Sequence, residues 1–205
     1  MNSFHGDSEF KQKYIDRVVA HKNADAIVQG RYWEEGKGCA VGCTFELSDN
    51  VHEAGAKEWD VPEWLLRLED TIFEGLPNDK AVNFPLQIIE AIPVGKSEDF
   101  FNQIKWKFSA FLLKENIDRV LDLDIEETLK KQIVESIRSV LNLYELALET
   151  SREWSESARS AAWSAADSAS RSAAESASWS ARSAAESAAY IRYRDELLKL
   201  LAETN

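Results

Sequence analysis

Two cysteines in a glycine-rich segment are the residues of this chain with the clearest potential for chemistry. Residues 30–44 read GRYWEEGKGCAVGCT and hold four of the eight glycines in the 205-residue sequence. Glycines allow positive φ and bring backbone N–H groups close together, which can hold an anion. A helix that starts just after Gly38 would place the thiol of Cys39 near a positive helix end, with Lys37 close in sequence. Both neighbours would lower the pKa of the thiol and favour the thiolate.

A nucleophilic thiol also needs a base. His5, His21 and His52 are the histidines of the chain, and nothing in the sequence fixes any of them beside Cys39. We therefore expect Cys39 and Cys43 to be a buried, inert pair that packs the loop, with a catalytic Cys39 as the alternative. No catalytic residue is assigned.

The same segment is a candidate site for a small ligand. Its aromatic flank can stack on a flat ligand or cap the core. It has neither the Gly-x4-Gly-Lys-Ser/Thr spacing of a phosphate-binding loop nor a hydrophobic strand before it, so the signal for phosphate is weak. The candidate ligand-binding residues are Tyr32, Trp33, Lys37, Gly38, Cys39, Cys43, His5 and His21.

Metal binding is a further alternative for the two cysteines. Cys39 and Cys43 are four residues apart, can share one helical face, and with two histidines could complete a four-ligand site. Structural zinc sites show two tight ligand pairs, whereas the histidines here are scattered. The sequence therefore predicts no metal and no cofactor.

The charge balance limits the classes of partner. The chain has 24 Lys and Arg against 36 Asp and Glu, a formal net charge of −12. This argues against direct nucleic-acid binding and against binding to anionic membranes, both of which need clustered basic residues. It permits a basic partner. Residues 1–150 carry 17 basic and 28 acidic residues, so the acidity is concentrated there.

Targeting signals are not apparent. The start, MNSFHGDSEF, has no cationic and no apolar region of a signal peptide. No apolar run approaches the roughly 20 residues that span a bilayer. Two cysteines in an otherwise cysteine-free chain fit a reducing compartment. We expect a cytoplasmic protein with no membrane association.

Helical periodicity dominates, and the predicted fold class is all-α. Asp7 or Ser8 caps a first helix that is expected to continue through Val28 and to end at Gly30. Residues 45–60 read as polar and irregular. Further helices are predicted between Pro62 and Gly75, near 82–92, after the N-cap Ser97, and over 124–150, where one stripe holds Leu129, Ile133, Ile137, Val140, Tyr144 and Leu148.

An alanine- and serine-rich repeat follows. From Ser157 to Ser187 short units beginning with serine recur eight times over 30 residues, close to the period of a helix. Small side chains let backbones approach closely, so this helix should lie against another. The partner is either helix 125–150 of the same chain or a second copy. Residues 190–205 then offer an anchor in Leu197, Leu198, Leu200 and Leu201.

Three stretches resemble an uncharacterised protein family found in bacteriophages and bacteria. They are FHGD, IVQGRYWEEGKGCAVGCT and VPEWLLRLEDTIFEGLP, all within residues 4–77. Members of that family often end in alanine-rich helical tails. The resemblance implies no activity and no catalytic residue. It implies a phage context, in which small acidic proteins often bind host proteins or sequester small ligands.

Together these observations predict a helical body over 1–122, containing the glycine-rich loop, and a long helical hairpin or tail over 123–205. The expected function is non-enzymatic binding by a homo-oligomer that associates through its Ala/Ser-rich helix. Such a protein would counteract a host system by binding a protein or a small anionic ligand. The alternative is a ligand-binding or thiol-dependent enzyme that uses the Cys39 loop.

Overall fold

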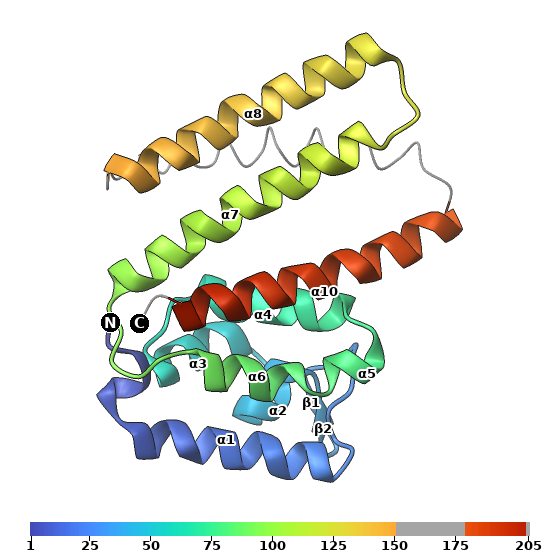
Figure 1. Ribbon diagram of the computed structural model, residues 1–205. Coiled ribbons are helices and arrows are strands. Elements are labelled where there is room, and N and C mark those ends of the chain that lie inside the picture. Colours follow the sequence, from blue (N-terminus) through green and yellow to red (C-terminus); the bar gives the residue numbers. More distant parts are fainter. Residues whose placement is uncertain (151–178, 204–205) are drawn as a thin grey trace. The chain divides into compact units, whose positions relative to one another are not determined.

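The all-α class is confirmed by the computed structural model, which describes residues 1–150 and 179–203 (Figure 1). Within those residues the β-structure consists of one antiparallel pair of two-residue strands, β1 (Trp33–Glu34) and β2 (Lys37–Gly38), and an isolated parallel bridge between Ile27 and Gly38. The Ala/Ser-rich repeat lies mostly outside the described residues, so its expected helix and its packing stay predictions.

The chain divides into two compact units. The first contains Met1–Asn102 together with Ala185–Asn205, and the second contains Gln103–Ala184. The last segment of the chain therefore joins the N-terminal unit, whereas the sequence grouped it with residues 123–205.

Short helices around one core build the first unit. Its elements in chain order are η1 (Ser3–Gly6), α1 (Ser8–Asn23), β1, β2, α2 (Ala40–Phe45), α3 (Val51–Trp59), α4 (Glu63–Gly75), α5 (Asn78–Ala81), α6 (Phe84–Ala91), the first turn of α7 (Glu98–Leu121) and the larger part of α10 (Trp179–Glu203).

The first helix begins as predicted and ends earlier. The Asp7 carboxylate accepts the N–H groups of Glu9 and Phe10 at 2.8 and 3.1 Å, which makes Asp7 the N-cap of α1. The predicted end at Gly30 is wrong, because α1 stops at Asn23. Residues 26–28 run extended instead, since Ala26 and Val28 exchange backbone hydrogen bonds of 2.9 and 2.8 Å with Gly38.

The sequence suggested that residues 45–60 are irregular. This prediction is wrong, because they contain α3. This helix buries Val51, Ala56 and Trp59 at helical spacing. Asn50 and Asp60 bound it with positive φ angles of 49° and 51°, so a residue in the left-handed conformation ends the helix on each side. The polar residues around these turns hide the short amphipathic pattern between them.

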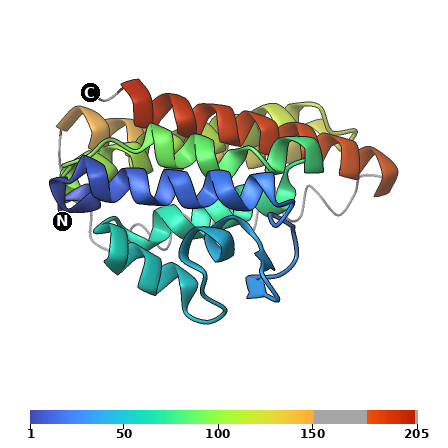
Figure 2. The same cartoon turned by 90° about the horizontal axis from the view of Figure 1, so that it is seen from below.

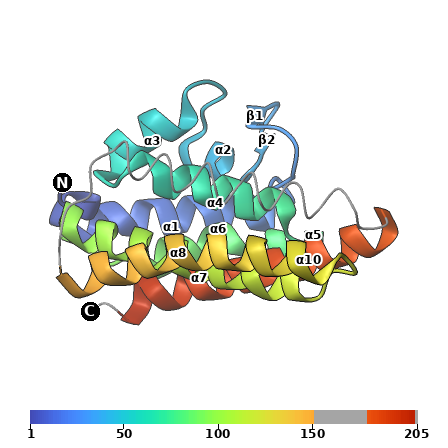
Figure 3. The ribbon, with the colours of Figure 1, turned by 90° about the horizontal axis from the view of Figure 1, so that it is seen from above.

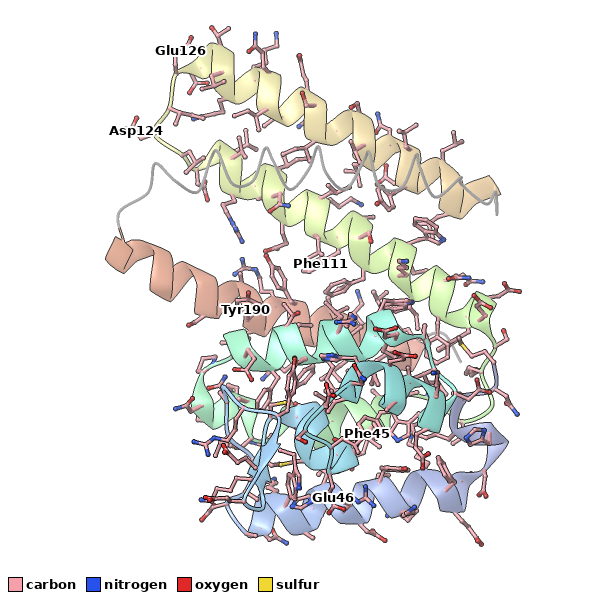
Figure 4. The ribbon with its side chains drawn as sticks, turned by 180° about the vertical axis from the view of Figure 1, so that it is seen from behind. Phe45, Glu46, Phe111, Asp124, Glu126 and Tyr190 are labelled. Atoms are coloured by element: carbon pink, nitrogen blue, oxygen red, sulfur yellow. The ribbon has the colours of Figure 1, made fainter. Side chains whose placement is uncertain are left out.

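The core of the first unit is rich in aromatic side chains. The ring of Trp59 lies 5.1, 5.5 and 4.8 Å from the rings of Phe4, Tyr14 and Phe45. Figure 2 shows α1 and α6 side by side along one face, and Figure 4 shows Phe45 inside the unit. The predicted helix after Pro62 is present as α4, which buries Leu65, Leu66, Ile72 and Phe73.

The C-terminal helix completes this unit. A Cβ added at Gly75 of α4 would lie 2.2 Å from the ring of Tyr190, so the ring packs directly on the α4 backbone. Leu197, Leu200 and Leu201 are buried, as the expected anchor requires.

The second unit contains an antiparallel pair of long helices, α7 and α8 (Glu127–Thr150) (Figure 1). The side chain of Glu126, labelled in Figure 4, accepts the N–H groups of Thr128 and Leu129 at 3.0 and 3.1 Å and caps α8. The predicted stripe forms the α8 side of the contact, although Leu129 itself is 47 % exposed. The buried cluster consists of Ala110, Leu113, Ile117, Val120, Val134, Ile137, Val140, Leu141 and Tyr144. Among the described helices, none combines the length and apolar character required to cross a bilayer.

Candidate functional site

The glycine-rich loop forms a tight hairpin. Trp33 pairs with Gly38 and Glu34 with Lys37, and the two residues between them, Glu35 and Gly36, have φ angles of 50° and 79°. Positive φ at both central positions is typical of a type I′ turn, whose twist matches that of paired strands. The hairpin lies beside α2 and α4 (Figure 3).

Two glycines let this hairpin lie directly on the start of α2. A Cβ at Gly38 would stand 1.7 Å from the carbonyl oxygen of Tyr32, and a Cβ at Gly42 would stand 1.8 Å from the same atom. No side chain fits there, because the neighbour is backbone. The two glycines therefore fix Tyr32 over the first turn of α2.

The two cysteines are both buried beneath the hairpin. Cys39 is the N-cap residue of α2 and is 1 % exposed, and Cys43 is fully buried. Burial is the main cause that raises the pKa of the Cys39 thiol, and the nearby carboxylates of Asp70 and Glu74 raise it further. The lowered thiol pKa on which the alternative of a catalytic Cys39 depends is therefore not found, because desolvation outweighs the helix terminus and Lys37.

The environment of Cys43 indicates a structural role for its thiol. Its Sγ lies 3.2 Å from the carbonyl oxygen of Gly38 and 3.5 Å from that of Ala26, and burial raises its pKa to about 11. The thiol thus ties the extended segment after α1 to the hairpin. The expectation of a buried cysteine pair that packs the loop agrees with this geometry.

The candidate histidines lie apart from Cys39. His5 contacts the carbonyl oxygen of Glu58 at 2.9 Å and packs against Phe10. His21 contacts the Glu46 carboxylate at 3.1 Å, and its ring lies 4.9 Å from that of Trp33. Figure 4 shows Glu46 beside α1.

Of the predicted ligand-binding residues, His21 therefore contacts Trp33, whereas His5 contacts residues of α1 and α3 instead. Lys37 is exposed on β2.

His52, which was outside the predicted set, lies next to the loop. Its ring packs edge-on against Tyr32 with centroids 5.7 Å apart, and its Nε2 lies 3.2 Å from Oδ2 of Asp70. The two residues border a small pocket of about 210 Å³ between the hairpin, the first turn of α3, and α4. The pocket is lined by Tyr32, Asn50, Val51, His52, Glu53 and Arg67.

Three potential metal ligands meet near this pocket, and one of them, Asp70, contacts its lining residue His52. One ligand atom each from Cys39, Asp70 and Glu74 lies within 4.8 Å of the other two. Oδ1 of Asp70 is buried and has no hydrogen-bond partner. The carboxylate of Glu74 accepts the Gly30 N–H, with distances of 3.1 and 2.9 Å to its two oxygens.

Charged side chains of both signs surround the pocket. Arg67 pairs with Glu63, and Glu53 pairs with Lys57, each one turn apart on its own helix. Asp70 pairs with His52, and Glu74 has no ion pair with a described residue. Burial and then the charge of Asp70 raise the pKa of Tyr32. The Asp70 and Glu74 carboxylates thus add negative charge beside a lining that holds one acidic and one basic side chain.

A second hollow of about 380 Å³ lies where residues 27–29 pass α4 and α5. Its floor is held by Gln29, whose side-chain amide donates to the carbonyl oxygens of Phe73 and Leu76 at 2.6 and 2.9 Å. No charged side chain lines it, so we see no basis for recognition of a charged ligand there.

The sequence missed His52, Asp70 and Glu74 as members of the site. The one available signal was the spacing of Asp70 and Glu74, which puts both carboxylates on one face of the predicted helix. Among 36 acidic residues, that spacing does not stand out. The link to Cys39 is a tertiary contact that no local pattern contains.

Comparison with known proteins adds no family or function: no protein-family model, no curated protein and no solved structure matches this chain. The bacteriophage context therefore stays a prediction from the resemblance of residues 4–77.

Proposed function

We propose that the protein is a binding protein, not a thiol-dependent enzyme, and that it binds a positively charged group of a partner at the pocket beside Tyr32 and His52. The observation that carries the proposal is the convergence of the Asp70 and Glu74 carboxylates, of which Asp70 contacts the pocket-lining His52. Among the described residues, neither carboxylate is paired with a lysine or an arginine. Two carboxylates on one helical face repel each other, and a bound cation relieves that repulsion.

The buried thiol argues against enzyme chemistry at this loop. A nucleophilic cysteine is a thiolate in an accessible, electropositive place. Cys39 is buried and lies beside carboxylates. The nearby base is His52, and its Nε2 faces Asp70. Asp70 therefore lies beside the thiol, in the place where a thiol-dependent enzyme needs the imidazole.

The size of the pocket fits one side chain better than a large ligand. Its volume of about 210 Å³ is below the roughly 300–1,000 Å³ of drug-sized ligand sites. Tyr32 is 42 % exposed, so its ring can pack on an ammonium or guanidinium group. A lysine or arginine of a partner protein matches this volume and the negative charge of Asp70 and Glu74, and the lining residue Arg67 is already paired with Glu63.

The acidity of the first unit supports the same partner. Residues 1–102 contain 10 Lys and Arg against 19 Asp and Glu. A negatively charged surface speeds the encounter with a positively charged partner and disfavours acidic competitors. The role against a host system, which the resemblance implies, would follow from such binding.

The proposal is tested with a fluorescently labelled arginine-containing peptide and the full chain, with a chelator present so that no metal competes. We expect saturable binding that weakens as salt increases, because the attraction is electrostatic. A glutamate-containing peptide of equal length should not bind. Equal binding of both peptides, or no binding of either at low salt, would contradict the proposal.

Matched variants separate the site from the overall charge. Asp70→Asn with Glu74→Gln removes two charges at the pocket. Glu34→Gln with Glu35→Gln removes two charges from the exposed part of the hairpin. We expect the first double variant to lose about tenfold or more in affinity and the second to change it by less than about threefold. Similar losses in both would show that only net charge matters.

Self-association is a second candidate, favoured by apolar side chains on the surface of α8. Leu143 and Leu146, one turn apart, are 43 % and 52 % exposed. The mass of the full chain in solution tests it: an assembly gives a multiple of 23.2 kDa, and Leu143→Lys with Leu146→Lys should return it to the monomer. A monomeric full chain would contradict this candidate.

A further inference from the structure

We propose that Cys39, Asp70 and Glu74 bind a divalent transition-metal ion, with Zn²⁺ the best match. This inference goes beyond the proposed partner binding and does not rest on it. The three side chains come from two parts of the chain, the start of α2 and one face of α4, and meet beneath the glycine-rich hairpin.

The donor atoms suit such an ion. One sulfur and two carboxylate oxygens lie within 4.8 Å of one another. Ligand atoms around tetrahedral zinc are separated by roughly 3–4 Å, as follows from bond lengths of about 2.0–2.3 Å. Glu74 is exposed at the edge of the cluster, so its side chain can move the short remaining distance. A thiolate among few ligands favours zinc or cobalt over magnesium and calcium, which take oxygen ligands.

The carboxylates are already oriented by neighbours that would form an outer shell. His52 Nε2 lies 3.2 Å from Oδ2 of Asp70, and the N–H of Gly30 lies 2.9 Å from Oε2 of Glu74. Such outer partners hold ligands in place at protein metal sites.

An unsatisfied atom points to a missing partner. Oδ1 of Asp70 is buried and has no N–H or O–H partner, Oδ2 lies 3.2 Å from Nε2 of His52, and the carboxylate as a whole interacts with the Cys39 thiol. Buried acceptors without a partner are uncommon and call for an explanation such as an ion. A cation beside Asp70 would satisfy this oxygen and separate the charges of Asp70 and Glu74.

Binding has a simple proton balance. The Sγ–H bond of Cys39 breaks, its proton goes to the buffer, and the thiolate electron pair forms the bond to the metal ion. Asp70 and Glu74 bind as carboxylates, and no electron is transferred. Affinity should therefore rise with pH, and about one proton should be released per ion bound at a pH where the free thiol is protonated.

Cobalt(II) is the probe, because its bond to a thiolate gives a charge-transfer absorption in the near ultraviolet that carboxylates do not give. The full chain is reduced, stripped with a chelator and titrated with Co²⁺, and then with Zn²⁺ as a competitor. We expect one Co²⁺ per chain, the thiolate absorption, and its loss when Zn²⁺ displaces the cobalt. Binding without that absorption would mean adventitious binding by surface carboxylates and would overturn the proposal.

Two cysteine variants make the test specific. Cys39→Ser should abolish the thiolate absorption. Cys43→Ser should retain it, because Cys43 is equally buried but is bonded to backbone carbonyls outside the cluster. The reverse pattern, or absorption that persists in Cys39→Ser, would overturn the assignment of Cys39.

The carboxylates are tested in the same way. Asp70→Asn and Glu74→Gln should each weaken Zn²⁺ binding by about 10–100-fold. Glu46→Gln is the control, because Glu46 contacts His21 and Arg17 and lies outside the cluster. Far-ultraviolet circular dichroism of every variant keeps loss of fold apart from loss of a ligand. Full affinity in the folded Asp70→Asn and Glu74→Gln variants would contradict the site.

Discussion

At the scale of single residues, the environment of Cys39 decides what the loop can do. The side chain is 1 % exposed and lies beside Asp70 and Glu74. A positive helix end lowers a thiol pKa only where the thiolate keeps some access to water. The glycines of this loop allow the backbone to pack closely over the Cys39 thiol. This packing excludes water from the thiol, and a nucleophilic thiolate needs access to water.

The reactivity of the Cys39 thiol tests this environment. In the metal-free native protein at pH 8, iodoacetamide should modify Cys39 on the order of 100-fold or more slowly than in urea, because burial raises the pKa of the thiol and blocks access. Mass spectrometry of timed samples measures the rate at each cysteine. Rapid modification of Cys39, with a titration midpoint below pH 8, would restore the thiol-enzyme alternative.

Glu69 is the second residue whose environment yields a prediction. Its side chain is fully buried on α4, and neither carboxylate oxygen has a hydrogen-bond partner. Burial and then the charge of Asp70 raise the pKa of Glu69 well above the usual value of a glutamate. In the folded protein the carboxyl group therefore stays protonated and neutral at pH values where an exposed glutamate is already ionised.

Glu69→Met replaces this unsatisfied group with an apolar one of similar shape. We expect the free energy of unfolding to rise by about 1–3 kcal/mol, because the buried polar atoms without partners are removed. Urea denaturation measures it, with Glu63→Met on the exposed face of the same helix as the control. A loss of stability would mean that Glu69 has a partner or a role that the fold alone does not require.

At the scale of elements, the hairpin and α2 depend on one close contact. Gly42→Ala would place a Cβ against the Tyr32 carbonyl oxygen, a contact of 1.8 Å with backbone. We expect a loss of about 3 kcal/mol in the free energy of unfolding, because backbone must shift. Gly36→Ala meets no atom within 4 Å and strains only a φ of 79°, so its cost should be about 1 kcal/mol. Equal costs would contradict the packing of the hairpin on α2.

The sequence predicted those elements whose signals are local. Asp7 caps α1, Pro62 precedes α4, and the stripe on residues 129–148 lies on α8, because caps, proline and apolar spacing act within a few residues. It misplaced the end of α1, because residues 26–28 leave the helix to bond Gly38 in the hairpin. It also missed α3, whose nine residues carry too short a periodic pattern.

The candidate site was only half predictable for the same reason. Tyr32 and Cys39 stand out in a glycine-dense segment, and the structure places both at the site. His52, Asp70 and Glu74 come from two other helices and meet these residues only through tertiary packing. The positive helix end was visible in the sequence, but the burial that outweighs it was not.

At the scale of the whole molecule, the chain closes on itself. Residues 185–205 belong to the same unit as residues 1–102, so the N-terminal unit is not complete until the end of the chain is made. Leu197 is fully buried there, and Tyr190 packs on Gly75. A chain that ends at Thr150 would therefore expose core surface instead of leaving an intact body.

Leu197→Ala tests this arrangement. We expect a loss of about 2–5 kcal/mol in the free energy of unfolding of the first unit, because a fully buried leucine is truncated. Lys199→Ala, on the exposed side of the same helix, should change it by less than about 0.5 kcal/mol. Thermal and urea denaturation followed by tryptophan fluorescence measure both. A small effect of Leu197→Ala would mean that the C-terminal helix is not part of the core.

We infer that the pocket between the glycine-rich hairpin, α3 and α4 recognises positive charge. The most direct measurement is a map of backbone amide chemical shifts in the full chain, with a chelator present, as an arginine-containing peptide is added. We expect the largest changes on residues 30–38, on the first turn of α3 and on Asp70 to Glu74, and we expect a glutamate-containing peptide to produce none of them. Changes confined to other surfaces, or the same changes with the acidic peptide, would contradict it.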